Sequence, residues 1–206
     1  MVDDRSIVRL SVFRPVGDAS VVDATLRDEV LPRLDGLDGL VGAWIGRRGA
    51  DQGHERRLVS VWRSRDDLAT AMGDAVVTPE FDRDHSRDIV AGACETLPLA
   101  ICLEFDRPGV PQVLRIFRGE VHDDELDHYV DEAKTGTLSD ASTPTGPLAL
   151  FLGVDPPRRF VTVSVWTDWA AIEATTGGNI HQPVATRHPE RLSSGTADHY
   201  EILGAG

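Results

Sequence analysis

Two groups of residues, one in each half of the sequence, combine arginines, hydroxyl groups and aromatic rings at alternating positions. Every second side chain of a β-strand points to the same face, so each group is expected to share one face of a sheet. Aromatic walls with a few hydroxyls and arginines are typical of a pocket for a flat, partly polar or anionic ligand. The first group is Arg9, Ser11, Phe13, Trp44, Ser60 and Trp62, and the second is Arg115, Phe117, Phe151, Thr162, Ser164 and Trp166.

Packing is the alternative interpretation of the same rings, because repeated Trp and Phe residues more often fill a core than bind a ligand. We favour packing for Trp44 and Phe151. For Trp62 and Trp166, two positions after Ser60 and Ser164, both interpretations stay open.

Two histidines, His85 and His188, lie at corresponding places in the two halves, 103 positions apart. Histidine titrates near neutral pH, so these residues are candidate proton-transfer groups at the mouth of a pocket. The alternative is that both are ordinary surface histidines. None of the seven histidines forms an HExxH or HxH pair, and we expect no metal site. The two cysteines, Cys94 and Cys102, are expected to be buried free thiols.

Composition and missing motifs exclude several classes of protein. The net charge of −13 argues against a nucleic-acid partner. No apolar stretch approaches the roughly 18 residues that a membrane helix needs, and the acidic start predicts a cytoplasmic protein without membrane attachment. The sequence lacks GxSxG, P-loop and GxGxxG motifs, so nucleophilic hydrolysis, phosphoryl transfer and nicotinamide chemistry have no support.

An internal repeat sets the organisation of the chain. LSVFR at residues 10–14 returns as LRIFR at 114–118, and the strand-like run ending at Trp62 returns at Trp166, both 104 positions apart. We predict two repeats, residues 1–106 and 107–206.

Each repeat has the pattern of a ferredoxin-like β-α-β-β-α-β unit. In the first, alternating strands surround a helix over ASVVDATLRDEVLPRL, capped by Asp18, and a short helix that follows Ser64. A further short helix is expected near Thr78-Pro79. The second repeat has a helix over DDELDHYVDEAK and a short helix from Asp168.

The fold class predicted is therefore α+β, with the two sheets packed against each other as a closed barrel. A uniformly aliphatic set of strand residues is expected under the helices. It comprises Leu10, Val12, Ala43, Ile45, Val59 and Val61, with Leu114, Ile116, Leu150, Leu152, Val163 and Val165.

The segment VSVWRSRDDLATAMGDAVVTPEF resembles the antibiotic biosynthesis monooxygenase (ABM) domains of the dimeric α+β barrel superfamily, and the likeness extends more faintly over the second half. It implies an intramolecular pseudo-dimer, able to pair further as a homodimer, with small-molecule ligands between sheet and helices. Some members of this family oxidise polycyclic aromatic substrates with O2 and no metal or flavin.

Trp62 and Trp166 match the family's strand-end Trp, but the histidine that commonly follows is absent. Its place is taken by Ala71 or Met72 in the first half and by Thr175 or Thr176 in the second. The first strand also lacks the asparagine of haem-degrading relatives, which disfavours haem degradation.

The resemblance implies a cofactor-independent monooxygenase that acts on a small aromatic or polyketide-like substrate. Trp62 or Trp166 would stack on the substrate beside Phe13 or Phe117, Arg9 or Arg115 would stabilise a developing anion, and His85 or His188 would relay protons. The alternatives are a non-catalytic ligand-binding or stress-associated protein, and a structural protein whose barrel is filled by side chains. The second half is the expected degenerate copy.

Overall fold

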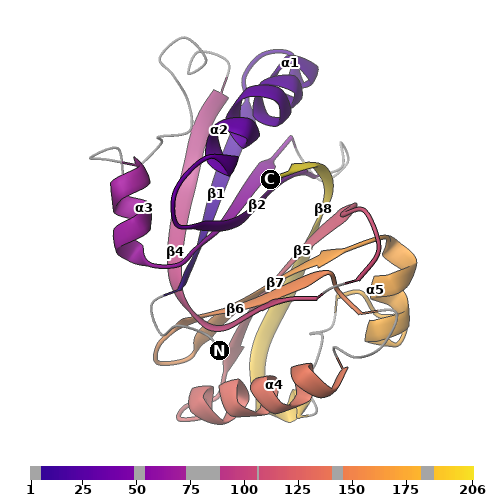
Figure 1. Cartoon of the computed structure of the whole chain (residues 1–206). Coiled ribbons are helices and arrows are strands. Elements are labelled where there is room, and N and C mark those ends of the chain that lie inside the picture. The colour runs from indigo at the N-terminus through magenta and orange to yellow at the C-terminus, as the bar shows by residue number, and fades with distance from the viewer. Residues whose placement is uncertain (1–5, 49–53, 73–88, 106, 141–145, 182–187) are drawn as a thin grey trace. The chain divides into compact units, whose positions relative to one another are not determined.

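A computed structural model describes residues 6–48, 54–72, 89–105, 107–140, 146–181 and 188–206. His85 and the short helix predicted near Thr78-Pro79 lie outside these residues. The chain divides into two compact units (Figure 1). Unit 1 comprises Asp3–Leu97 with Tyr200–Gly206, and unit 2 comprises Pro98–His199.

The elements alternate as the sequence predicts, with two long strands, β4 and β8, that contribute to both units. The first half contains β1 (Ile7–Pro15), α1 (Ala19–Thr25), η1 (Leu26–Val30), α2 (Leu31–Asp35), β2 (Leu40–Arg47), β3 (Arg56–Trp62), α3 (Arg65–Met72) and β4 (Ile89–Glu104). The second contains β5 (Val113–Val121), α4 (Leu126–Asp140), β6 (Ala149–Asp155), β7 (Arg159–Trp166), α5 (Trp169–Thr176), η3 (Pro189–Arg191) and β8 (Leu192–Ala205).

The caps predicted at Asp18 and Ser64 and the helix start predicted at Asp168 are confirmed. The Asp18 carboxylate accepts a hydrogen bond from the Ser20 amide at 2.8 Å, and Asp168 accepts one from the Ala171 amide at 2.8 Å. Ser64 accepts from the Asp67 amide at 3.0 Å. Such bonds satisfy amides that the first turn of a helix leaves without a partner.

Hydrogen bonding orders the strands as β1-β3-β2-β8-β5-β7-β6-β4, the order of a closed barrel. The two repeats also pair in equivalent register. Arg9 lies opposite Ser60 in unit 1, and Arg115 lies opposite Ser164 in unit 2. The repeat seen in the sequence is thus a repeat of strand pairing.

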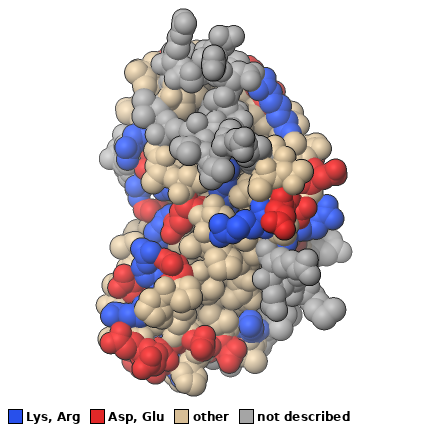
Figure 2. Space-filling model, turned by 90° about the vertical axis from the view of Figure 1, so that its left-hand side faces the viewer, with Lys and Arg blue, Asp and Glu red and all other residues tan. Residues whose placement is uncertain are grey.

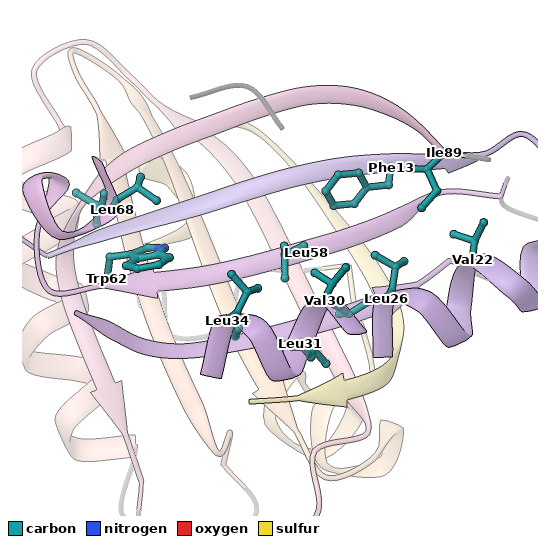
Figure 3. Packing of buried hydrophobic residues seen from close by; sticks show 13 residues of the cluster. Phe13, Val22, Leu26, Val30, Leu31, Leu34, Leu58, Trp62, Leu68 and Ile89 are labelled. Atoms are coloured by element: carbon teal, nitrogen blue, oxygen red, sulfur yellow. The ribbon is translucent and has the colours of Figure 1, made fainter. Parts of the chain in front are cut away.

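Figure 3 shows the core of unit 1, in which strand residues pack against the helices. Phe13, Leu58 and Trp62 face the helical residues Val22, Leu26, Val30, Leu31 and Leu34. Ala43 and Ile45 belong to the same cluster, as predicted.

The prediction that Leu10, Val12, Val59 and Val61 lie under the helices is wrong. These residues are buried, but the strand positions that face the helices in β1 and β3 are those of Phe13 and Trp62. The cause is the register of β2 on β3, in which Ala43 pairs with Ser60 and Trp44 pairs with Val59. Ala43 therefore shares the helix-covered face with Ser60, whereas Trp44 lies on the opposite face with Val59. Alternation gives two faces for each strand, but only pairing shows which faces coincide.

Unit 2 repeats this arrangement. Phe117, Phe160 and Tyr129 pack together between the sheet and α4, while Val113 and Trp166 pack against Ile172 of α5. Leu150 and Leu152 face the helices as predicted.

The other aliphatic residues predicted for that helix-covered face, Leu114, Ile116, Val163 and Val165, are buried but alternate with the strand residues that face the helices. Phe151 pairs with Val163, so it lies on the face opposite to Ser164.

Surface charges of both signs are interspersed on the face drawn in Figure 2. Several exposed arginines bind carboxylates, for example Arg47 with Glu201 at 2.9 Å and Arg27 with Asp28 at 2.7 Å. Among the described helices, none combines the length and apolar character required to cross a bilayer.

Candidate functional site

A buried Trp–Ser pair occurs in each unit. The Trp62 indole N–H donates to Ser60 Oγ at 2.9 Å, and the Trp166 indole N–H donates to Ser164 Oγ at 2.8 Å. All four residues are almost completely buried. A buried indole needs an acceptor, and a serine two positions earlier on the same strand face supplies it locally.

Each pair lies beside a buried arginine on the neighbouring strand. Arg9 of β1 is 2% exposed and Arg115 of β5 is 0% exposed. Both arginines share the helix-covered face with their Trp–Ser pair. The structure therefore brings together six predicted residues as two equivalent triads: Arg9, Ser60 and Trp62, and Arg115, Ser164 and Trp166.

In unit 1 the arginine points to a thiol. Arg9 Nε donates to Cys94 Sγ at 3.1 Å, and Ser11 Oγ lies 3.5 Å from the same sulfur. Cys94 is exposed and Cys102 half-buried, so the prediction that both thiols are buried is wrong. Local spacing could not place Cys94 in this site, because Cys94 lies 85 positions from Arg9.

In unit 2 the equivalent arginine binds the backbone. Arg115 Nε and Nη2 both donate to the carbonyl oxygen of Ile180, each at 3.2 Å. Burial lowers the pKa of Arg115 to about 10. Its guanidinium carbon also lies 5.5 Å from the centre of the Phe117 ring, within the range of a cation–π contact. The neutral Ile180 oxygen thus accepts the Arg115 hydrogen bonds that the sequence analysis assigned to a ligand.

Tyr129 of α4 is a buried residue of this site that the sequence interpretation missed. Its ring stacks on Phe160 with centroids 4.2 Å apart. Burial raises the pKa of its hydroxyl, against the opposing effect of a hydrogen bond with Thr162. The helical spacing of Leu126, Tyr129 and Ala133 was the available signal for its inward direction.

The predicted histidines are not assembled with these triads in the described part of the chain. His188 is exposed, precedes η3, and lies 2.8 Å from a Glu190 carboxylate oxygen through Nδ1. His85 lies outside the described residues. Within the described ranges, no three His, Cys, Asp or Glu residues are placed to hold a metal ion.

The two triads can therefore do different chemistry. The Arg9 triad presents a guanidinium, a thiol and two serine hydroxyls beside Phe13 and Trp62, which suits a flat ligand with an anionic oxygen. The Arg115 triad is closed by a backbone carbonyl.

No protein-family model matches the sequence, and a search of curated proteins gives no match. Solved structures do match. Two are described as "putative monooxygenase". The one from Fusobacterium nucleatum is 11% identical with a TM-score of 0.76, covering 98% of this chain and 94% of that chain. The one from Lactobacillus acidophilus is 13% identical with a TM-score of 0.70, covering 98% of each chain.

A third structure, from Listeria monocytogenes, is described as a ferredoxin-fold protein related to antibiotic biosynthesis monooxygenases. It is 9% identical, with a TM-score of 0.57 and coverage of 98% and 96%. Chlorite dismutases share the fold as well. At these identities the likeness shows the fold alone, a ferredoxin-like α+β architecture.

Proposed function

We propose that this protein is a monooxygenase of the ABM type, which oxidises a small aromatic, polyketide-like substrate with O2 in unit 1 and needs no metal or flavin. The observation that carries this proposal is the environment of Arg9. Its buried guanidinium shares a helix-covered sheet face with Ser60 and Trp62 and donates to the exposed Cys94 thiol. The monooxygenase descriptions of structural neighbours support the reaction class.

The proposed substrate contains a methylene group next to a carbonyl within an aromatic system. Loss of a proton from the methylene produces an enolate, and Arg9 stabilises its oxygen through charge and hydrogen bonding. Trp62 and Phe13 pack against the rings. The enolate carbon bonds to O2, the resulting peroxide takes up the proton, and loss of water leaves a new carbonyl. The methylene compound and O2 thus become a ketone and water.

His85 is the proposed proton acceptor in unit 1. This role rests on the titration range of histidine and on its place in the sequence of the same half. His188, its counterpart in unit 2, is paired with Glu190 and exposed. We propose turnover in unit 1 alone, because the Arg115 donors of unit 2 already bind Ile180.

Oxygen uptake with anthrone as the probe tests the proposal. Arg9→Gln is expected to lower kcat/KM by roughly 100-fold or more, the effect typical of losing one oxyanion donor. Trp62→Phe is expected to raise KM more than it lowers kcat. Arg47→Gln, which alters an exposed arginine paired with Glu201, is the matched control and should keep full activity.

The alternative is a non-catalytic binding protein. The supporting observation is His188, a candidate proton-transfer residue, which is exposed and lies 2.8 Å from a Glu190 carboxylate oxygen. Saturable quenching of tryptophan fluorescence by anthrone with no oxygen uptake would support that alternative and overturn the enzymatic proposal.

A further inference from the structure

The segment Gly177–His181, called the strap below, lies directly on Arg115. Its Ile180 carbonyl accepts hydrogen bonds from Arg115 Nε and Nη2. Its Ile180 side chain packs against the cluster of Val113, Trp166 and Ile172. The start of the strap also caps α5, because the Gly178 amide donates to the Glu173 carbonyl at 2.8 Å and the Asn179 amide donates to that of Thr176 at 3.4 Å. Ile180 thus adds one polar and one apolar contact with the Arg115 site to a segment anchored on α5.

The polar contact is a poor match for an arginine. The Nε and Nη2 donors of a guanidinium form a fork that fits the two oxygens of a carboxylate. Here both donors converge on one neutral oxygen at 3.2 Å, longer than the roughly 2.7–2.9 Å of a charge-assisted bond. A carboxylate at this place would give each donor its own charged acceptor.

The environment of Arg115 also favours an anion. The side chain is fully buried, and burial lowers its pKa to about 10, so the folded unit disfavours the positive charge. An opposite charge within hydrogen-bonding distance offsets such a desolvation cost. The neighbouring Phe117 and Trp166 rings favour a ligand that is itself aromatic.

Two glycines at the end of α5 give the strap a point about which Ile180 can move away from Arg115. Gly177 and Gly178 have φ angles of 66° and 87°, and a Cβ on either would meet nothing within 4 Å. Two consecutive exposed glycines in open space can change conformation without a steric barrier from neighbours. At the other end, the His181 ring meets His199 edge-on with centroids 5.8 Å apart.

We infer that Arg115 is a carboxylate-binding site of unit 2, that the strap closes it by placing the Ile180 carbonyl on the guanidinium, and that a small aromatic carboxylate displaces this carbonyl. All residues involved belong to unit 2. The inference does not depend on the oxidation proposed for unit 1.

Benzoate and benzamide are matched probes, because they share a shape and differ in charge. The test is an amide NMR titration of the full ¹⁵N-labelled chain with each compound up to about 10 mM, a range that detects millimolar dissociation constants. Benzoate is expected to shift the Gly177, Gly178 and Ile180 signals saturably, and benzamide to leave them in place. Equal shifts with both compounds, or no saturable shift with benzoate, would overturn the inference.

Two variants, Gly178→Ala and Arg115→Lys, should change the affinity for benzoate in opposite directions. Gly178→Ala penalises the left-handed backbone of the docked strap and should tighten benzoate binding by about fivefold. Arg115→Lys keeps the charge but loses the fork, and should weaken binding by about tenfold or more. Arg158→Lys, at a half-exposed arginine of the same unit, is the control. Weaker benzoate binding in Gly178→Ala, or unchanged benzoate binding in a folded Arg115→Lys, would contradict the inference that benzoate and the Ile180 carbonyl compete for Arg115.

Arg9→Gln separates the two proposals. It should lower kcat/KM for oxygen uptake by the roughly 100-fold or more expected above, while the benzoate shifts of the strap amides persist. Loss of the strap shifts in Arg9→Gln would place the benzoate site outside unit 2 and contradict the inference.

Discussion

At the scale of single residues, the two triads show how the same side chains acquire different partners. Arg9 and Arg115 occupy equivalent strand positions, yet one donates to a thiol and the other to a backbone carbonyl. The Trp–Ser bonds, in contrast, are the same in both units. The Trp–Ser pair depends only on two positions of one strand, whereas the arginine partner comes from a distant segment.

Removing the serine acceptor tests how much the Trp62–Ser60 hydrogen bond contributes to stability. Ser60→Ala leaves the buried Trp62 N–H without its hydrogen bond and should lower the free energy of unfolding by about 1–3 kcal/mol. Urea denaturation measures the change. In the double variant Ser60→Ala/Trp62→Phe the two costs should not add, because the unsatisfied N–H is gone. Additive costs would show that the bond contributes nothing.

The buried Tyr129 hydroxyl and the half-buried Cys102 thiol make stability fall at alkaline pH. Burial raises the pKa of Tyr129 and of Cys102 above their ordinary values of 10.0 and 9.0. Above these values the unfolded chain loses protons that the folded chain keeps, so the free energy of unfolding decreases as pH rises. Urea denaturation at a series of pH values should show this decrease from about pH 9. Tyr129→Phe should make it shallower above pH 10, and an unchanged slope would contradict the assignment.

At the scale of elements, local signals set where helices begin, and tertiary packing sets their shape. Asp18, Ser64 and Asp168 cap helices as their sequence patterns predict. The first predicted helix is continuous, but its middle turn, η1, is a π-helix. Its apolar residues Val22, Leu26 and Val30 still face the sheet.

Two glycines that bracket the connection between α2 and β2 should respond differently to substitution. Gly39 has a φ of 85°, and a Cβ there would collide with the Asp67 side chain. Gly39→Ala should therefore cost about 2 kcal/mol or more. Gly36 has a φ of −88° and open space around a Cβ.

Gly36→Ala is the matched control and should be neutral or stabilising by about 0.4–1 kcal/mol. Thermal unfolding compares the two variants. Equal effects would show that the backbone of Gly39 is not constrained as described.

At the scale of the whole molecule, the two repeats share strands. The end of β8 pairs with β2 in unit 1, where Ala43 and Gly206 exchange backbone hydrogen bonds of 2.8 and 3.0 Å. The last part of β4 pairs with β6 in unit 2. The sequence repeats predicted as 1–106 and 107–206 are therefore interlocked by chain segments that cross the repeat boundary.

Deleting Tyr200–Gly206 should destabilise unit 1 specifically. The deletion removes the end of β8, which is one of the two partners of β2, and the buried Tyr200 hydroxyl, which donates to Glu55 at 2.9 Å. An uncovered strand edge also promotes association between molecules. Hydrogen exchange should show faster exchange of the β2 amides with β5 and β7 amides still protected, and sedimentation should show oligomers. Unchanged protection of β2 would contradict the pairing.

The sequence by itself determined the repeat, the order of elements, the helix caps and the residues of both triads. Each of these depends on local spacing: a period of two along a strand, a capping residue before a helix, or a recurrence 104 positions later. The net charge argued against a nucleic-acid partner, and the missing motifs left hydrolysis, phosphoryl transfer and nicotinamide chemistry without support, before the fold was known.

Only the tertiary structure decided which sheet face the helices cover, and what the two arginines bind. Both depend on strand register and on segments far apart in the chain, such as Cys94 beside Arg9 and Ile180 beside Arg115. Alternation fixes the two faces of each strand but not their match across strands, because a shift of one residue exchanges the faces. The partners of the arginines could not be predicted for the same reason: they are set by contacts between distant segments, and no local spacing encodes them.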